Sequence, residues 1–250
     1  MKNKLDKQKQ VLFTVGVHGD EQSPVIVAKS ILGKDNFLIG NPRALKKNVR
    51  YIESDLNRSF PGNPGGTIEE RRAGQLVEKL ERYKRVVDFH TATCATSPFV
   101  ITTKITQRHM ALASKTGVGK IVLMSREFGA GKSLIDFVPV GISIESGREK
   151  SAKTKEVIEK IMLQILNKEP SKKKTVIYEV FDCLKKSNKS EFLSPEIHPF
   201  KLITKGDQIT NLGLKAKTDF YPVLPRSKNY PNFLCLMARK VNLLDINVKI

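Results

Sequence analysis

Three side chains in the sequence are suited to holding a metal ion: His18, Glu21 and His90. Two imidazoles and a carboxylate are a ligand set of catalytic zinc sites, which keep a fourth position for water. Each histidine by itself is more often a structural hydrogen-bonding residue. All three residues follow or end short apolar runs that predict strands, at residues 11 to 17 and 85 to 90. Together they therefore favour a zinc site that holds one ion per chain.

Alternating strands and helices are expected to position these ligands. Ligands collect at the carboxyl ends of strands in an open α/β sheet, which is where the two apolar runs place the histidines. The alternation predicts an α/β fold with a mostly parallel sheet and helices on both faces. Further strands are expected at residues 37 to 39, 99 to 103, 120 to 124 and 140 to 144, and a turn is expected at 41 to 43. Helices are expected at 21 to 32, 107 to 115 and 152 to 166, and another helix should begin at the capping pair Thr67 and Glu70.

The pattern changes after residue 168. The Lys, Pro and Ser residues between 168 and 174 predict a linker. Beyond it, β-type runs at 176 to 181, 200 to 203 and 233 to 237 are separated by Pro, Gly and Asn turns. The sequence therefore predicts a catalytic domain over residues 1–168 and a small antiparallel β domain over 169–250.

The composition is strongly basic, with 44 Lys and Arg residues against 25 Asp and Glu residues and a net charge of +19. A positive field attracts anions, so nucleic acid and small acidic molecules are both candidate partners. The lysine runs lack the interleaved aromatic residues that stack on bases, which favours a solvated surface and makes nucleic acid the weaker candidate.

The sequence lacks an apolar run long enough to span a membrane, and its basic first ten residues are not followed by the apolar region of a signal peptide. Its 3 cysteines show no paired spacing, which is typical of reduced thiols. We therefore expect a cytoplasmic protein without a membrane partner, with a homo-oligomer left open.

Several motifs in order resemble the succinylglutamate desuccinylase and aspartoacylase family, which is itself similar to the zinc carboxypeptidases. The match extends over most of the chain, and its C-terminal part resembles the aspartoacylase branch in particular. The motifs are Gly-Val-His-Gly-Asp-Glu at 16 to 21, Asn-Pro-Arg-Ala at 41 to 44, Arg-Tyr-Ile at 50 to 52, Asp-Leu-Asn-Arg-Ser-Phe at 55 to 60, Asp-Phe-His at 88 to 90, Ser-Ile-Glu-Ser-Gly at 143 to 147, and Phe-Tyr-Pro-Val at 220 to 223 followed by Tyr230.

The resemblance implies a zinc-carboxypeptidase-like mixed sheet flanked by helices, with a small C-terminal β domain that contributes to the substrate pocket. It also implies a zinc-dependent amidohydrolase that releases the acyl group of a small N-acyl amino acid. N-acetylaspartate or an N-succinyl amino acid is the expected type of substrate, because cationic site residues and a positive net charge suit a molecule with two or more carboxylates.

The same resemblance assigns roles to further residues. Glu145 would act as general base and then acid, and Arg50 would stabilise the oxyanion. Asp55 would accept the outer N–H of His18 and fix its tautomer. Asn57 and Arg58 would hold a substrate carboxylate, since a guanidinium group binds that anion through two parallel hydrogen bonds.

One further assignment departs from the family pattern, and another depends on that pattern alone. Lys132 stands nearest to the position of a further substrate-binding arginine, but lysine cannot make the same two-pronged contact. Tyr230 would complete the pocket from the second domain. The stretch from Gly129 to Ser133 also resembles the end of a nucleotide-binding loop, but Arg126 occupies the position of that motif's first glycine.

Two alternative functions stay open. A zinc carboxypeptidase acting on peptides would share the metal site but need an open groove. A basic nucleic-acid-binding module that merely retains the fold would need neither the zinc ligands nor Glu145.

Overall fold

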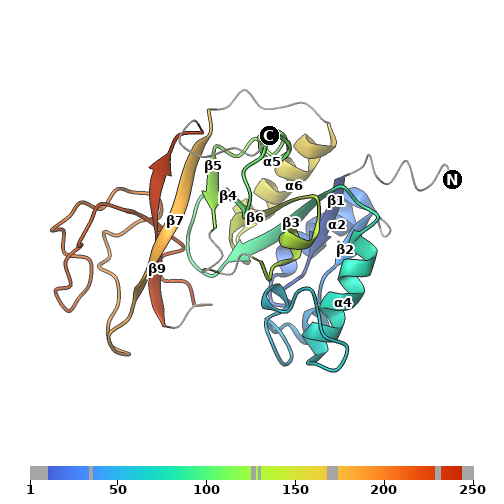
Figure 1. Ribbon diagram of the computed structural model, residues 1–250, viewed down its shortest axis with the longest axis horizontal. Coiled ribbons are helices and arrows are strands. Elements are labelled where there is room, and N and C mark those ends of the chain that lie inside the picture. The colour runs from blue at the N-terminus through green and yellow to red at the C-terminus, as the bar shows by residue number, and fades with distance from the viewer. Residues whose placement is uncertain are drawn as a thin grey trace.

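A single sheet of nine strands forms the centre of the computed structural model, in the order β2-β1-β3-β6-β4-β5-β7-β9-β8 (Figure 1). The structure describes residues 11–33, 36–124, 128, 131–167, 174–228 and 232–243. The strands are β1 (Val11–Val15), β2 (Phe37–Ile39), β3 (Arg85–Ala92), β4 (Phe99–Thr102), β5 (Lys120–Leu123), β6 (Val140–Arg148), β7 (Val176–Lys185), β8 (Tyr221–Val223) and β9 (Phe233–Val241).

The sheet joins two groups of parallel strands. Strands β2, β1, β3 and β6 run parallel to one another, and so do β4, β5 and β7. The two groups meet at the antiparallel pair β4 and β6, and β8 and β9 add antiparallel pairs at one edge. The expectation of a mixed, mostly parallel sheet flanked by helices is confirmed.

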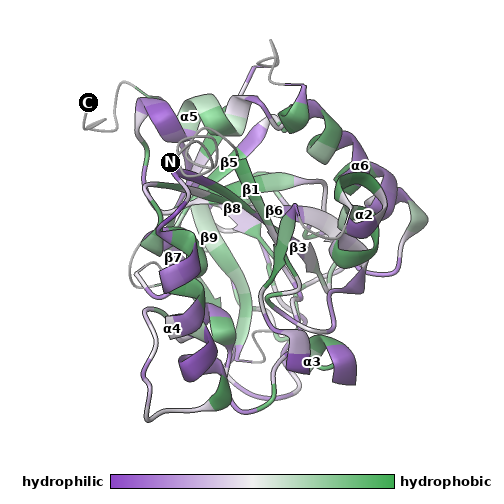
Figure 2. Ribbon diagram, turned by 90° about the vertical axis from the view of Figure 1, so that its right-hand side faces the viewer, coloured by the Kyte–Doolittle hydropathy of each residue, from purple (hydrophilic) through white to green (hydrophobic). Residues whose placement is uncertain are grey.

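Helices cover both faces of this sheet. Alternate residues of β1 and β3 point to opposite faces, so Phe13 and Val87 pack with α2, α5 and α6, whereas Leu12 and Val86 pack with α4. Figure 2 shows the largely apolar strands enclosed by helices with polar outer surfaces. The helices are α2 (Gln22–Leu32), α3 (Pro42–Lys47), α4 (Ile68–Leu80), α5 (Gln107–Ser114) and α6 (Ala152–Leu166), with 3-10 helices at η1 (Leu56–Arg58) and η3 (Leu134–Phe137).

Some local predictions were wrong. The expected turn at 41 to 43 begins α3, because the Asn41 side chain accepts a hydrogen bond from the Ala44 N–H and Pro42 suits the first helical turn. Residues 200 to 203 do not form a strand; Ile203 makes only an isolated bridge to Phe220. Strand β8 was not predicted, and residues 168 to 173 of the expected linker lie outside the described residues.

The C-terminal part of the chain shares the central sheet. Strand β7 pairs with β5 of the preceding part, and β9 pairs with β7. A separate apolar cluster, which includes Leu193, Ile209 and Phe220, lies beyond these strands. The boundary at residue 168 stays a prediction. Among the described helices, none combines the length and apolar character that crossing a membrane requires.

A buried carboxylate anchors the loop between α3 and η1. Glu69, fully buried near the start of α4, accepts hydrogen bonds from the backbone N–H groups of Ile52, Glu53 and Ser54 at 2.7, 3.1 and 3.1 Å. The Asn41 side chain donates a fourth bond at 3.0 Å. Burial opposes ionisation of Glu69, but these donors outweigh it and lower its pKa. Glu69 thereby fixes the loop that carries residues 50 to 55.

Replacing Glu69 with alanine should therefore loosen this loop. We expect Glu69→Ala to lower the free energy of unfolding by about 2 to 4 kcal/mol, because it leaves several N–H groups unpaired. The amides of Ile52, Glu53 and Ser54 should exchange with deuterium faster than in the unaltered protein. The control is Glu78→Ala on the exposed side of α4. Unchanged exchange at residues 52 to 54 would contradict the anchoring role.

Candidate active site

The parallel pairing of β3 and β6 places two of the predicted site residues side by side. His90 is the register partner of Glu145, and Asp88 is the partner of both Thr14 and Ser143. Because alternate residues share a face, Asp88, His90 and Glu145 all project to the α4 side of the sheet. The pairing therefore gathers these polar side chains near the carboxyl ends of β1, β3 and β6.

The loop after β1 brings the other two ligand candidates to the same place. His18 and Glu21 lie between the end of β1 and the first turn of α2. This loop packs closely on α3, since a Cβ atom on Gly19 would lie 2.1 Å from the carbonyl carbon of Ala44. Only glycine fits at that position, so the close packing sets the path of the loop that carries His18.

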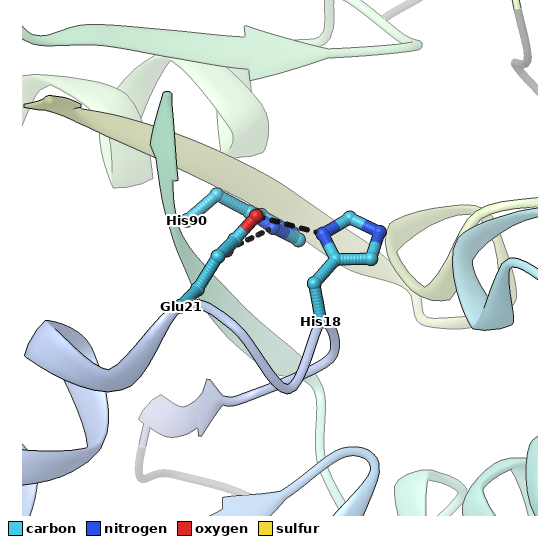
Figure 3. A group of neighbouring side chains, drawn as sticks. All are labelled: His18, Glu21 and His90. Atoms are coloured by element: carbon cyan, nitrogen blue, oxygen red, sulfur yellow. Dashed lines mark hydrogen bonds and ion pairs between the residues drawn. The ribbon is translucent and has the colours of Figure 1, made fainter. Parts of the chain in front are cut away.

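His18, Glu21 and His90 form a compact cluster (Figure 3). Their candidate ligand atoms all lie within 4.8 Å of one another, and all three residues are buried. The Glu21 carboxylate lies between the two imidazoles, with Oε1 at 2.8 Å from Nδ1 of His18 and Oε2 at 3.0 Å from Nδ1 of His90. Both Nδ1 atoms therefore point toward the Glu21 carboxylate that lies between the two rings.

The outer nitrogen of each ring is held by another carboxylate. Nε2 of His18 lies 3.1 Å from Asp55 Oδ1, and Nε2 of His90 lies 2.6 Å from Asp88 Oδ2. The Thr14 hydroxyl donates to the other Asp88 oxygen at 2.6 Å. An Nε2–H that donates to a carboxylate leaves Nδ1 with a lone pair for a metal, and such partners are typical of histidine ligands.

The charges in this cluster fit a bound cation. Burial opposes the charged form of both histidines, but Glu21 and the outer carboxylates outweigh it and raise the pKa of His18 and, more strongly, that of His90. The two imidazoles in turn overcome burial and lower the pKa of Glu21. Positive charge between these three groups is therefore stabilised, whether as protons on the rings or as a metal ion. The donor set fits zinc.

Glu145 differs from the other carboxylates of the site. Its Oε2 is buried and accepts no hydrogen bond from any residue that the structure describes. Burial raises its pKa to about 7, with Glu21 adding to the shift and His90 opposing it. A carboxyl group near this pKa can both accept and release a proton at neutral pH, as a general base or acid must.

The predicted oxyanion residue and two of the predicted substrate-binding residues line the same cavity as the ligand cluster. Arg50, Asn57 and Arg58 contribute to its wall. Arg50 donates to Asp55 at 2.9 Å and lies 3.8 Å from Glu21. The Arg58 guanidinium donates to the carbonyl of Asn57 at 2.8 Å. The structure therefore brings two cationic side chains into the cavity that holds the ligand cluster.

Two predicted residues are not placed in the cavity. Lys132 is exposed and does not belong to the cavity lining; its backbone carbonyl accepts a bond from the Phe60 N–H. In the neighbouring loop, Asp136 accepts hydrogen bonds from the backbone of Gly131 and from both the backbone and the hydroxyl of Ser133. The Asp136 carboxylate thus occupies the position that a phosphate would take in a nucleotide-binding loop. Tyr230 lies outside the described residues.

Two carboxylates next to the ligand residues, Asp88 and Glu149, were given no role in the sequence analysis. Asp88 was noted in a motif but given no role, although its place two residues before His90 in a strand puts both on one face. Glu149 accepts bonds from the backbone and hydroxyl of Ser23 and from the hydroxyl of Thr91. It thereby ties the start of α2 to β3, next to Glu21 and His90. No sequence motif identifies Glu149.

Beyond the ligand cluster, the cavity wall combines apolar side chains with hydroxyl groups. Ile101, Met124 and Phe128 line it from β4 and from the segment after β5, and Leu224 lines it from the chain after β8. Ser227 adds a hydroxyl from the same C-terminal part. The remaining lining residues are Thr91, Ala92, Thr103, Ser133, Ile135 and Ser143.

Comparison with known sequences identifies relatives that match part of the chain. A probable aspartoacylase of Prochlorococcus marinus subsp. pastoris is 31% identical over 160 residues, which cover 56% of this chain and 53% of the relative. A succinylglutamate desuccinylase of Pseudomonas aeruginosa is 32% identical over 107 residues, covering 35% of this chain and 32% of the relative. The chain spans about half the length of the first relative and about a third of the second.

Solved structures share the fold over nearly the whole chain. Murine aminoacylase 3 superposes with a TM-score of 0.73 at 19% identity, covering 93% of this chain and 95% of the other. A succinylglutamate desuccinylase from Vibrio parahaemolyticus gives a TM-score of 0.72 at 17% identity, covering 94% and 83%. At these identities the likeness establishes the fold alone.

The family assignment comes from the pattern of the N-terminal part. The model of the succinylglutamate desuccinylase/aspartoacylase catalytic domain matches residues 7–166, which include the whole His18, Glu21 and His90 cluster as well as Glu145. This match covers well over half of the 250 residues. The chain therefore belongs to the succinylglutamate desuccinylase/aspartoacylase family.

Proposed function

We propose that this protein is a zinc-dependent deacylase that releases the acyl group of a small N-acyl amino acid. One observation carries the proposal: a His, Glu and His cluster with both Nδ1 atoms facing inward shares a buried cavity with Glu145, whose Oε2 has no partner among the described residues. Family membership and the aminoacylase and desuccinylase names of its relatives support the same chemistry.

His18, Glu21 and His90 would hold the zinc. When bound, zinc supplies a Lewis acid that brings the pKa of water from about 15.7 toward about 7. The Asp55 and Asp88 carboxylates keep each imidazole in the tautomer whose Nδ1 carries a lone pair. The chain's own contribution is thus a set of ligands whose orientation is fixed before the ion arrives.

Glu145 would move the protons of the reaction. It accepts a proton from the attacking water and delivers it to the nitrogen of the departing amine, so that one carboxyl serves as base and then as acid. Arg50 faces the ligand cluster and would stabilise the negative charge that develops on the scissile carbonyl oxygen. Asn57 and Arg58 would hold the carboxylate of the amino acid.

The alternatives from the sequence make different demands on the cavity. A peptide substrate needs room for residues beyond the scissile bond, whereas Leu224 and Ser227 of the C-terminal part line the same cavity as the ligand cluster. A nucleic-acid module needs neither the ligand cluster nor the unpaired Glu145 carboxyl. Both features therefore favour hydrolysis of a small amide.

The zinc content of the protein tests the metal assignment. After removal of metals with a chelator and reconstitution, we expect one zinc ion per chain, and we expect His90→Ala to weaken zinc binding by at least about 100-fold. The comparison variant is His198→Ala, since His198 is exposed and distant in the sequence from the cluster. Equal zinc affinity in the two variants would refute the assignment.

The role of Glu145 is tested by kinetics on N-acetyl amino acids. Glu145→Gln keeps the shape of the side chain but cannot take a proton, so kcat/KM should fall by at least about 100-fold. Zinc content should stay at that of the unaltered protein. Glu159→Gln, at an exposed position of α6, serves as the control. A Glu145→Gln variant that retains more than a tenth of the activity would exclude the base role.

The raised pKa of Glu145 also predicts a pH-dependent stability in the metal-free protein. The folded pKa of about 7 lies above the ordinary value of 4.5, so the folded state favours the protonated carboxyl. The resulting stabilisation is complete below about pH 4.5 and disappears as the pH rises through 7.

Glu145→Gln removes the buried charge that destabilises the folded protein at high pH. At pH 8 the variant should be more stable than the unaltered protein by at least about 1 kcal/mol, and this difference should shrink as the pH falls toward 5. Urea unfolding of both metal-free proteins at pH 5 and pH 8 measures it. A difference that does not depend on pH would show that Glu145 titrates normally.

A further inference from the structure

We propose that the cavity selects N-acyl amino acids with an apolar side chain over those with an acidic one. This inference deepens the proposed deacylase function and rests on it. It departs from the substrate with two or more carboxylates that the sequence suggests. Three features of the cavity point to this preference: the makeup of its wall, the position of its cationic groups and the hydrogen bonds of its hydroxyl groups.

Part of the wall away from the ligand cluster is an apolar patch. Ile101, Met124, Phe128 and Leu224 all line the cavity and all belong to the same hydrophobic cluster. Leu224 is buried, whereas the other three are only partly buried on the side of the cluster that borders the cavity. An alkyl or aromatic side chain of a substrate would cover the exposed parts of these residues and remove apolar surface from water.

The proposed reaction already gives a role to each cationic side chain of the described cavity lining. Arg50 and Arg58 are the cationic residues among the described lining. Arg50 is paired with Asp55 and faces the scissile carbonyl in the proposed function, and Arg58 would take the α-carboxylate. Lys132, the expected third cation, is exposed and outside the lining. Within the described part of the lining, a second substrate carboxylate would thus lie near the anionic groups Glu21 and Glu145 or against the apolar patch.

Two hydroxyl groups of the wall do not offer a proton to a second carboxylate either. Thr103 donates its hydroxyl proton to Asp136 Oδ1 at 2.6 Å, and Ser133 donates to Asp136 Oδ2 at 2.6 Å. Asp136 therefore engages both donors on this side of the cavity. A carboxylate that loses its water without gaining donors binds poorly, so this side of the wall disfavours an acidic side chain.

The test compares substrates on the zinc-loaded full chain. The N-acetyl derivatives of L-leucine, L-methionine and L-phenylalanine are measured against those of L-aspartate and L-glutamate. We expect kcat/KM to be about 100-fold higher for the best apolar substrate than for N-acetylaspartate. If N-acetylaspartate is hydrolysed as efficiently as the apolar series or more so, the specificity inference is overturned and the deacylase function stands. If no N-acyl amino acid is hydrolysed, both are overturned.

A variant places a cation in the wall. Met124→Lys should lower kcat/KM for N-acetylleucine and raise it for N-acetylaspartate, so that their ratio falls by at least about 10-fold. Leu163→Lys is the matched control, because Leu163 is 42% exposed on α6 and outside the cavity. An unchanged ratio in folded Met124→Lys would overturn the assignment of this wall. The comparison of substrates on the unaltered protein stands by itself should that variant fail to fold.

Discussion

The parallel pairing of β3 with β1 and β6 is the constraint on which the active site depends. In a strand, neighbouring side chains point to opposite faces, so the register decides which residues meet across the sheet. The observed register sets His90 beside Glu145 and Asp88 beside Thr14, all on the α4 side. A slip of one residue would move Phe89 into the cavity and His90 into the apolar core. The large buried residues on the opposite face, such as Phe13 and Ile144, fix this register and thereby keep the site residues on the same side of the sheet.

Buried and half-buried carboxylates organise the site in a chain that is otherwise strongly basic. Asp55 and Asp88 each hold the outer nitrogen of one histidine, Glu69 fixes the loop that carries Asp55, and Glu149 joins the segments beside Glu21 and His90. Each accepts hydrogen bonds that compensate for the loss of water. The Oε2 atom of Glu145 is buried among them without such compensation from the residues that the structure describes, and the pKa of Glu145 is raised accordingly. The contrast separates carboxylates that position other groups from the one suited to exchanging a proton.

The sequence predicted the parts of the site that depend on strand ends, and much less of what surrounds them. Apolar runs located β1 and β3 and thus His18 and His90, because burial on both faces leaves a clear pattern. The helix α3 was missed because Pro42 after Asn41 suits a turn as well as a helix start, and residues 200 to 203 lack a neighbouring strand to extend their bridge. Glu149 and the apolar wall of Ile101, Met124 and Leu224 come from separate segments, and only tertiary packing joins them.

Both histidines turn Nδ1 toward the proposed metal position, while a carboxylate holds each Nε2. A crystal structure of the zinc-loaded protein, with the ion located by anomalous scattering at the zinc edge, tests this arrangement. We expect one zinc ion at about 2.0 to 2.2 Å from Nδ1 of His18, from Nδ1 of His90 and from a Glu21 oxygen. Asp55 and Asp88 would keep their bonds to the Nε2 atoms. Zinc held through Nε2 of either ring, or bound away from this cluster, would show that the proposed ligand arrangement is wrong.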